Sequence, residues 1–174
     1  LRDIATELGG MDFEQAVRQE DRTRLWQARH NAFWAIKERW AGRELLATDA
    51  CVPVSRLAEN LERTRADIAE LHHITAAPLF GHVGDGNFHA AILYDPGNSD
   101  EQAHAEELQR RIAVRAIASQ GTCTGEHGVG VHKRKYLLDE FGEEGVGLMR
   151  AVKNALDPLN ILNPGKVLPD RSDA

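Results

Sequence analysis

Apolar positions in the first third of the chain recur at helical spacing and then change to a strand-like pattern. Spacings of three and four over residues 11–40 predict a helix that carries Phe13, Val17, Leu25, Trp26, Phe33 and Trp40. Residues 45–54 are apolar and partly β-branched, which predicts a strand ending at Pro53. Ser55 is expected to cap the next helix, whose apolar face carries Leu57, Leu61, Ile68 and Leu71.

The second half of the chain combines one alternating segment with several helical ones. Residues 79–94 alternate around an Asp-Gly pair, which is typical of a β-hairpin. Helices are predicted in three segments, 100–120, 133–141 and 144–156. Because strands and helices do not strictly alternate, this order predicts an α+β fold with helices on one face of a mostly antiparallel sheet.

The sequence GHVGDGNFH, residues 81–89, places two histidines seven positions apart. If Asp85 and Gly86 form a two-residue type I′ turn, His82 lies directly opposite His89. Opposed residues share a face with Cβ atoms about 4.5–5.5 Å apart, which suits two imidazoles that bind one metal ion. The same register sends an apolar set to the other face, where it can join a core: Leu79, Val83, Phe88 and Ile92.

A third candidate ligand lies in the glycine-rich segment GEHGVG, residues 125–130. Glu126, with His82 and His89, makes a three-ligand set that leaves an open position, as in catalytic zinc sites. Because adjacent side chains usually diverge, His127 would face a substrate as a general base. Two alternatives stay open: the histidines can be surface polar residues, and the loop can be flexible or cradle a phosphate. The dinucleotide fingerprint GxGxxG and the P-loop are both missing, which disfavours nucleotide binding.

Composition and charge narrow the class of protein. Hydrophobic residues make up 42% and charged residues 28% of the 174 positions, as in soluble globular proteins. The net charge of -6 disfavours a nucleic-acid partner. Two cysteines outside any CxxC motif favour a reducing compartment, and no run of apolar residues is long enough for a membrane span. We therefore expect a cytoplasmic protein without a transmembrane segment, with peripheral membrane attachment and a homodimeric state left open.

Three stretches carry a resemblance to a known family: GHVGDGNFH, GTCTGEHGVGVHKRKYL and MRAVKNALDPLNILNPGKVLP. Together they resemble the C-terminal region of the FAD-linked oxidases of the vanillyl-alcohol oxidase superfamily, over nearly the whole chain. The branch in question contains FAD-dependent D-lactate dehydrogenases, one of the subunits of glycolate oxidase, and D-2-hydroxyglutarate dehydrogenases. The segments LWQARHNA, residues 25–32, and ATDACVPVS, residues 47–55, look closest to the D-lactate members.

The resemblance implies roles for individual residues. The family's metal ligands and catalytic histidine fall on the residues already singled out, His82, His89, Glu126 and His127. Arg29 falls on an arginine that binds the substrate carboxylate, and Asn163 lies in a segment that returns to the flavin. Zinc is the expected metal, with manganese and iron as alternatives, because all three accept histidine and carboxylate ligands.

The resemblance also implies how the chain is organised. Residues 1–120 look like part of the substrate (cap) domain, a ferredoxin-like antiparallel sheet with helices on one face. Residues 121–174 look like a C-terminal helical segment. The family's FAD-binding domain is missing from the chain, so FAD is expected to bind through an N-terminal domain, onto which residues 121–174 would pack.

The leading hypothesis is therefore a fragment of a flavin- and metal-dependent dehydrogenase. The enzyme would oxidise a small D-2-hydroxy acid, such as D-lactate, to the 2-oxo acid and pass electrons to an acceptor that the sequence does not identify. The fragment alone is expected to be inactive. Two alternatives stay open: a metal-dependent hydrolase, and a non-catalytic fragment whose histidines only steady the fold.

Overall fold

The computed structural model describes residues 2–13 and 15–170. The chain divides into two compact units, Leu1–Ala41 and Gly42–Ala174. The predicted boundary after residue 120 stays a prediction. The parts of the predicted segments that fall on residues 1, 14 and 171–174 lie outside the described residues.

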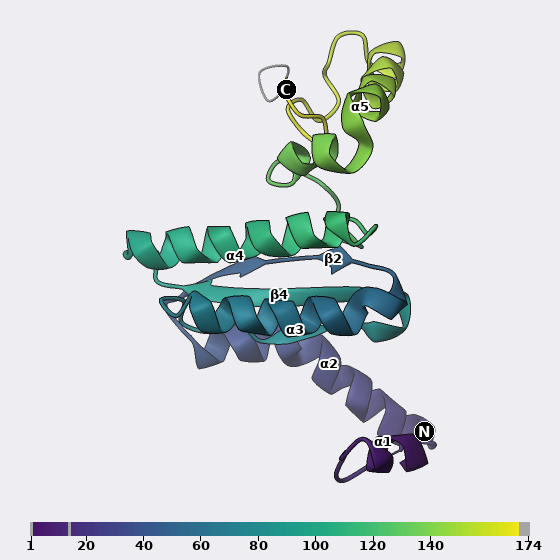
Figure 1. Ribbon diagram of the computed structural model, residues 1–174, viewed down its shortest axis with the longest axis vertical. Coiled ribbons are helices and arrows are strands. Elements are labelled where there is room, and N and C mark those ends of the chain that lie inside the picture. The colour runs from purple at the N-terminus through teal and green to yellow at the C-terminus, as the bar shows by residue number, and fades with distance from the viewer. Residues whose placement is uncertain (1, 14, 171–174) are drawn as a thin grey trace. The chain divides into compact units, whose positions relative to one another are not determined.

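The first unit contains the helices α1 (Arg2–Glu7) and α2 (Gln19–Arg39) (Figure 1). The helix predicted over residues 11–40 starts later than expected, because α2 begins after Arg18, whose backbone is extended. Asp12 has a φ of 54°, which a right-handed helix does not allow. The prediction is therefore wrong for the described residues before Gln19 and confirmed for the remainder, apart from Trp40 at the C-cap.

The second unit is an antiparallel sheet with helices packed against it (Figure 1). Its strands are β1 (Glu44–Ala47), β2 (Ala50–Cys51), β3 (Leu79–His82) and β4 (Asn87–Tyr94). Its longer helices are α3 (Val54–Glu70), α4 (Ser99–Ala118) and α5 (Leu137–Leu156), and short 3-10 turns cover Val83–Asp85 and Arg134–Tyr136. The predicted α+β class is confirmed.

Strand β4 is paired along both edges. β3 pairs with one edge, and β1 and β2 pair with the other. β1 and β2 keep a single register, since Glu44 lies opposite Tyr94 and Cys51 lies opposite Asn87. The strand predicted over residues 45–54 is thus present over half of its length: it is interrupted between Ala47 and Ala50, and it ends at Cys51 instead of Pro53.

Alternation along β4 separates a core face from a second face. Phe88, Ala90 and Ile92 point into the hydrophobic core. Helices α3 and α4 cover this face with the side chains of Leu57, Ala105, Leu108, Ile112 and Ala116. The predicted placement of helices on one face of the sheet is therefore confirmed, and Asn87 and His89 are left on the opposite face.

The hairpin of β3 and β4 forms two residues out of the predicted register. His82 lies opposite Asn87, and His89 lies opposite Phe80, so the predicted direct opposition of the two histidines is wrong. A slip of two residues preserves the face of every strand residue, because the side-chain period is two. The histidines therefore still share a face as diagonal neighbours. Val83, which we expected in the core, is instead 63% exposed.

The turn explains the change of register. Residues 83–85 form a 3-10 turn and Gly86 follows with a φ of 75°, so the loop has more than the two predicted residues. The N–H of Val52 donates to the carbonyl of Gly86 at 3.0 Å. A Cβ on Gly86 would lie 1.9 Å from the carbonyl oxygen of Val52. Contact with the chain after β2 therefore holds the wider turn, which sequence-local turn rules do not include.

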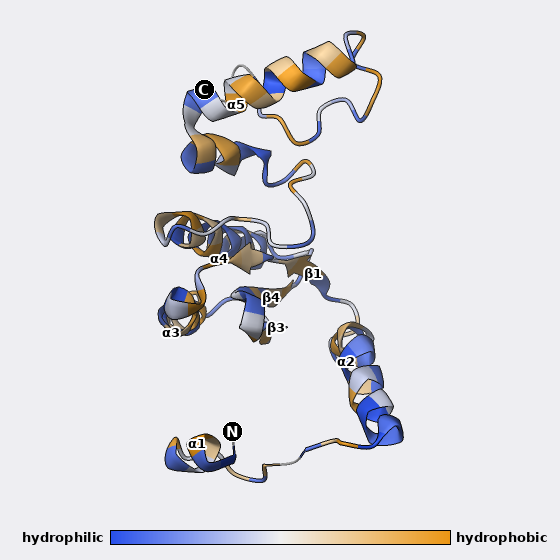
Figure 2. Cartoon of the chain, turned by 90° about the vertical axis from the view of Figure 1, so that its right-hand side faces the viewer, coloured by the Kyte–Doolittle hydropathy of each residue, from blue (hydrophilic) through white to orange (hydrophobic). Residues whose placement is uncertain are grey.

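Two helix boundaries also differ from the predicted ones. α3 begins at Val54 with Pro53 as its N-cap, not Ser55. Proline suits a helix start because its φ is fixed and its missing N–H is not needed there. α5 joins the helix predicted over 144–156 to the second half of the one predicted over 133–141, across a kink at Gly142, where φ is 67°. Apolar and polar bands alternate along α5 (Figure 2).

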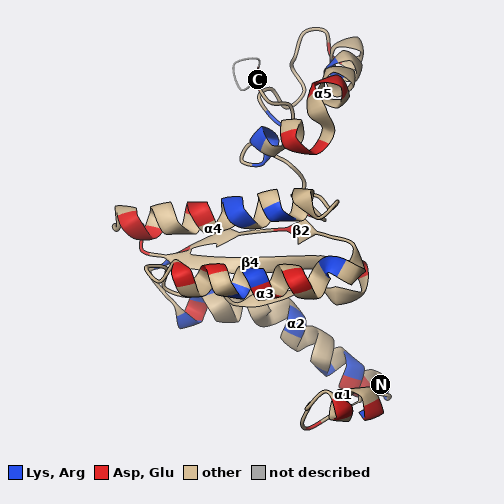
Figure 3. Cartoon of the chain, in the orientation of Figure 1, with Lys and Arg blue, Asp and Glu red and all other residues tan. Residues whose placement is uncertain are grey.

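Ion pairs tie α3 to α4, and both helices carry many charged residues (Figure 3). Arg111 of α4 contacts Asp67 and Glu70 of α3 at 3.0 Å each, and Glu107 of its own helix at 2.9 Å. Arg110 contacts Glu107 at 2.7 Å. Hydrogen bonds from Arg110 and Arg111 lower the pKa of Glu107 to about 2.

We expect Glu107→Gln to reduce the loss of unfolding free energy that occurs as the pH falls below about 4.5. A carboxylate whose pKa is lowered on folding stabilises the protein above its usual pKa of 4.5, and this contribution is lost as the pH falls toward about 2. Urea unfolding at a series of pH values measures the effect. Glu106→Gln is the matched control, because that neighbouring carboxylate accepts from the neutral amide of Gln102 instead. An unchanged loss of unfolding free energy over this pH range in Glu107→Gln would contradict the prediction.

Candidate metal centre

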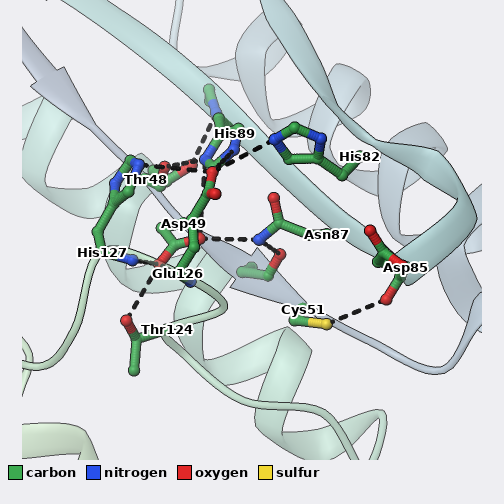
Figure 4. Close-up of polar contacts among 12 residues, drawn as sticks. Thr48, Asp49, Cys51, His82, Asp85, Asn87, His89, Thr124, Glu126 and His127 are labelled. Carbon is green, nitrogen blue, oxygen red and sulfur yellow. Dashed lines mark hydrogen bonds and ion pairs between the residues drawn. The ribbon is translucent and has the colours of Figure 1, made fainter.

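Both histidines of the hairpin lie on the face of the sheet opposite the core (Figure 4). Their ring centroids are 6.2 Å apart and the rings are nearly perpendicular, at 88°. The side chain of His89, in the middle of the sheet, is only 3% exposed, whereas that of His82, at the end of β3, is partly exposed. One imidazole is thus fixed by its surroundings, and the other borders solvent.

Glu126 reaches both histidines from the loop that follows α4 (Figure 4). Its Oε1 lies 2.9 Å from Nε2 of His89 and 3.6 Å from Nε2 of His82. One donor atom from each of these three residues lies within 4.8 Å of the others. The structure therefore brings the three predicted ligands together.

The surroundings of His89 fit a cation between its ring and Glu126. Nδ1 of His89 lies 3.1 Å from the carbonyl oxygen of Thr48, so Nδ1 must carry a proton to donate. Nε2 faces the Glu126 carboxylate, which is a second acceptor. A neutral imidazole that donates from Nδ1 turns the lone pair of Nε2 toward this carboxylate, so two ligand-type atoms face each other. A metal ion bonded to Nε2 and to the carboxylate satisfies both acceptors, as in carboxylate- or carbonyl-oriented histidine ligands.

His127 also points into the site, although we expected it to diverge from Glu126. Its Nε2 lies 3.7 Å from Oε1 of Glu126. Its ring stacks on the ring of His89, with centroids 5.0 Å apart and an interplanar angle of 12°. Half of the His127 side chain is exposed. A small molecule can therefore reach a ring nitrogen next to the three ligands.

Asp49 is a site residue that the sequence analysis missed. Its carboxylate is fully buried, and its Oδ2 accepts the backbone N–H groups of Glu126 at 2.9 Å and His127 at 2.8 Å. Burial raises the pKa of Asp49, but the hydrogen bonds from His127, Glu126 and Asn87 and the charge of Lys133 outweigh it and hold the pKa well below the usual range. A lone aspartate inside an apolar strand was the available signal, because buried carboxylates are rare unless paired.

A second group of residues, Asp49, His89 and His127, also has donor atoms within 4.8 Å of one another. It is a poor metal site because the oxygens of Asp49 are already occupied. Oδ1 accepts from Asn87 at 2.8 Å, and Oδ2 accepts the two backbone N–H groups and the hydroxyl of Thr124. Two of the loop amides that could have cradled a phosphate, those of Glu126 and His127, are used by this same carboxylate.

The approach of the loop to the sheet requires a glycine at position 125. A Cβ there would lie 2.1 Å from Nδ2 of Asn87 and 3.1 Å from Oδ1 of Asp49. Glycine lets a backbone approach its neighbours closely. At Gly125 the backbone approaches side chains of the same chain, and this contact brings Glu126 to the histidines.

Two further predicted site residues belong to other parts of the chain. Arg29 lies on α2, in the first unit, and its role in substrate binding stays a prediction. Asn163 follows α5 with a φ of 47°, and its carbonyl accepts the N–H of Lys166 at 3.3 Å. It lines a polar hollow together with Arg150, Lys153 and Lys166. Its contact with a flavin also stays a prediction.

Comparison with known proteins identifies the family. The family described as "FAD linked oxidases, C-terminal domain" matches residues 1–167. The chain belongs to this family. The resemblance to the C-terminal region of FAD-linked oxidases, which three sequence stretches indicated, is thereby confirmed.

Relatives of this FAD-linked oxidase domain include named dehydrogenases. It is 46% identical over 166 residues to "Probable D-lactate dehydrogenase, mitochondrial" of Danio rerio. The aligned region covers 95% of this chain and 33% of that protein. The domain is 40% identical over 169 residues to "D-lactate dehydrogenase [cytochrome], mitochondrial" of Arabidopsis thaliana, over 97% and 30%. It is 34% identical over 169 residues to glycolate oxidase subunit GlcD of Escherichia coli, over 97% and 33%. The chain spans about a third of the length of these relatives.

Among solved structures, the FAD-linked oxidase domain is similar to 4-ethylphenol oxidase from Gulosibacter chungangensis in an isoeugenol complex. The TM-score is 0.58 at 19% identity, over 90% of this chain and 32% of that one. At this identity the likeness concerns the fold alone.

Within residues 2–13 and 15–170, the helices are too short or too polar to cross a membrane.

We expect Gly125→Ala to destabilise the FAD-linked oxidase domain by about 1–3 kcal/mol, because the new methyl group would overlap the amide of Asn87. Chemical denaturation measures the free energy of unfolding. Gly147→Ala is the matched control, since a Cβ at that position in α5 meets open space and alanine favours a helix. Equal stability of the Gly125→Ala variant and the unsubstituted protein would contradict the close approach.

Proposed function

We propose that this chain supplies the metal ligands and the general base of a flavin-dependent D-2-hydroxyacid dehydrogenase of the D-lactate type. The observation that carries the proposal is the convergence of His82, His89 and Glu126 beside the half-exposed His127. Relatives named D-lactate dehydrogenase support the substrate class. FAD would bind to a part of the enzyme outside this chain, so the chain alone would be inactive.

The side chains divide the chemistry between them. A divalent cation, zinc first with manganese and iron as alternatives, would fit the donor set of His82, His89 and Glu126, and when bound it would lower the pKa of a substrate hydroxyl while FAD accepts hydride. His127 takes the hydroxyl proton at a ring nitrogen, as histidine does in general-base catalysis. By the family resemblance, Arg29 of the first unit would bind the substrate carboxylate.

The C-terminal segment, residues 121–174, is proposed to pack against the flavin-binding part of the enzyme. Large apolar side chains are exposed along α5 and after it: Leu148, Val152, Leu156, Leu159, Ile161 and Leu162. Clustered exposed apolar side chains favour a protein contact. Asn163 follows this stretch directly, which supports its placement near the flavin.

The homodimer and the cytoplasmic location stay predictions, and the named D-lactate relatives are described as mitochondrial.

We expect His82→Ala and His89→Ala to remove the bound metal and to lower turnover more than about 100-fold in the full-length enzyme, because each deletes a ligand. Elemental analysis measures the metal. The rate at which D-lactate bleaches the flavin under anaerobic conditions measures the hydride-transfer half of turnover. His72→Ala is the matched control, since its Nδ1 lies 2.8 Å from the carbonyl oxygen of Glu70 at the end of α3. Full turnover by metal-free enzyme would overturn the metal assignment.

We expect His127→Gln to keep the metal and to lose about 100- to 10,000-fold in turnover, because glutamine cannot take the hydroxyl proton. Metal content and flavin reduction are measured on the same sample. Family membership favours the dehydrogenase over the hydrolase. Hydrolysis without flavin reduction would favour the hydrolase, and normal turnover in His127→Gln would leave His127 without a catalytic role.

A further inference from the structure

We propose that Thr48 and Asp49, in the break between β1 and β2, are positioning residues for the metal centre. Thr48 orients the ring of His89, and Asp49 holds the backbone of Glu126 and His127 against the sheet. This inference rests on the proposed function, because it concerns the same ligands and base. Neither residue touches the ligand-facing nitrogen or carboxylate oxygen; each acts through its neighbours.

The side-chain hydroxyl of Thr48 takes the place of the carbonyl of the same residue in the strand ladder. Its N–H donates to the carbonyl of Ala90 at 3.0 Å, so the two residues form a hydrogen-bonded antiparallel pair. The return bond of such a pair normally runs from the N–H of Ala90 to the carbonyl of Thr48. Here that N–H donates to Oγ1 of Thr48 at 2.7 Å. The carbonyl is thereby released to accept from Nδ1 of His89 at 3.1 Å, which turns Nε2 toward Glu126.

Asp49 fixes the loop through charge-assisted hydrogen bonds. Its Oδ2 accepts both backbone N–H groups of the Glu126–His127 pair and the hydroxyl of Thr124, at 2.8–3.0 Å. Lys133 places its ammonium 3.5 Å from the same oxygen and balances the buried charge. Such bonds are about twice as strong as those between neutral groups. The two side chains that face the metal and the substrate are therefore set by one carboxylate on the sheet.

The chain offers a matched control for a buried carboxylate, Asp157. This aspartate at the end of α5 accepts the backbone N–H groups of Ile161 at 3.0 Å and Leu162 at 2.9 Å and pairs with Lys153. Like Asp49, it accepts two consecutive backbone N–H groups and lies beside a lysine, but it holds a different loop. Asp49→Asn and Asp157→Asn each remove a negative charge from a buried aspartate that holds two consecutive backbone N–H groups of a loop, so their comparison separates positioning from general stability.

The test measures zinc affinity of the full-length enzyme by competition with a chromogenic chelator, and amide hydrogen exchange at residues 124–128. We expect Asp49→Asn to weaken zinc binding about 10- to 100-fold and to speed exchange at Glu126 and His127. Asp157→Asn should lower the free energy of unfolding and leave both readouts unchanged. If Asp49→Asn does not fold, Thr124→Val decides, because it removes one donor to Asp49 and should weaken zinc binding severalfold.

Thr48 is tested by conservative rescue. Thr48→Val keeps the shape and removes Oγ1, so the carbonyl of residue 48 should return to the N–H of Ala90 and release His89. Zinc binding should weaken about 10-fold or more. Thr48→Ser retains the hydroxyl and should restore affinity.

The outcomes separate the two proposals. One outcome would overturn the positioning role alone. In it, the unsubstituted enzyme binds zinc, and the affinity is unchanged in Asp49→Asn, Thr124→Val and Thr48→Val. An equal loss of affinity in Asp157→Asn would also overturn it, as an effect of general stability. Absence of zinc, manganese and iron binding in the unsubstituted enzyme would overturn the proposed function and this inference together.

Discussion

The pairing of β4 along both edges is the constraint on which the second unit depends. With partners on each side, the strand cannot rotate, and its alternate residues are committed to opposite faces. Phe88, Ala90 and Ile92 are buried under α3 and α4. His89 is thereby fixed on the other face, and its neighbours supply the polar partners that a buried imidazole requires.

The candidate site is divided between a rigid part and an attached part. The histidines belong to the sheet, whereas Glu126 and His127 come from a loop that reaches the sheet by a few directed contacts. The carboxylate of Asp49 and the missing side chain of Gly125 act on the same short segment, one by attraction and the other by permitting proximity. The arrangement explains how a glycine-rich loop presents two side chains in one direction.

The sequence predicted the fold class and the helices on one face, because these depend on alternation. It also singled out three residues that the structure brings together, His82, His89 and Glu126, because of their residue chemistry. Their role as metal ligands stays a proposal. The sequence did not predict the register of the hairpin. The turn at Gly86 is held by Val52, a contact between distant segments that local turn preferences do not contain. Asp49 was missed for a similar reason, since its partners are far along the chain. The extent of α2 was overestimated because spacing alone does not locate a helix start.

The sequence separation of the three proposed ligands has a consequence for the order of folding. His82 and His89 lie on one hairpin, and hairpins form within about 1–10 μs, although the register of this one is held by the contact of Val52 with Gly86. Glu126 lies beyond α4 in the sequence, so its contact with the histidines is non-local, and we expect it to form later than the hairpin. A metal ion present during synthesis would therefore meet a two-histidine site first. Its coordination would be completed only when the remainder of the second unit has folded.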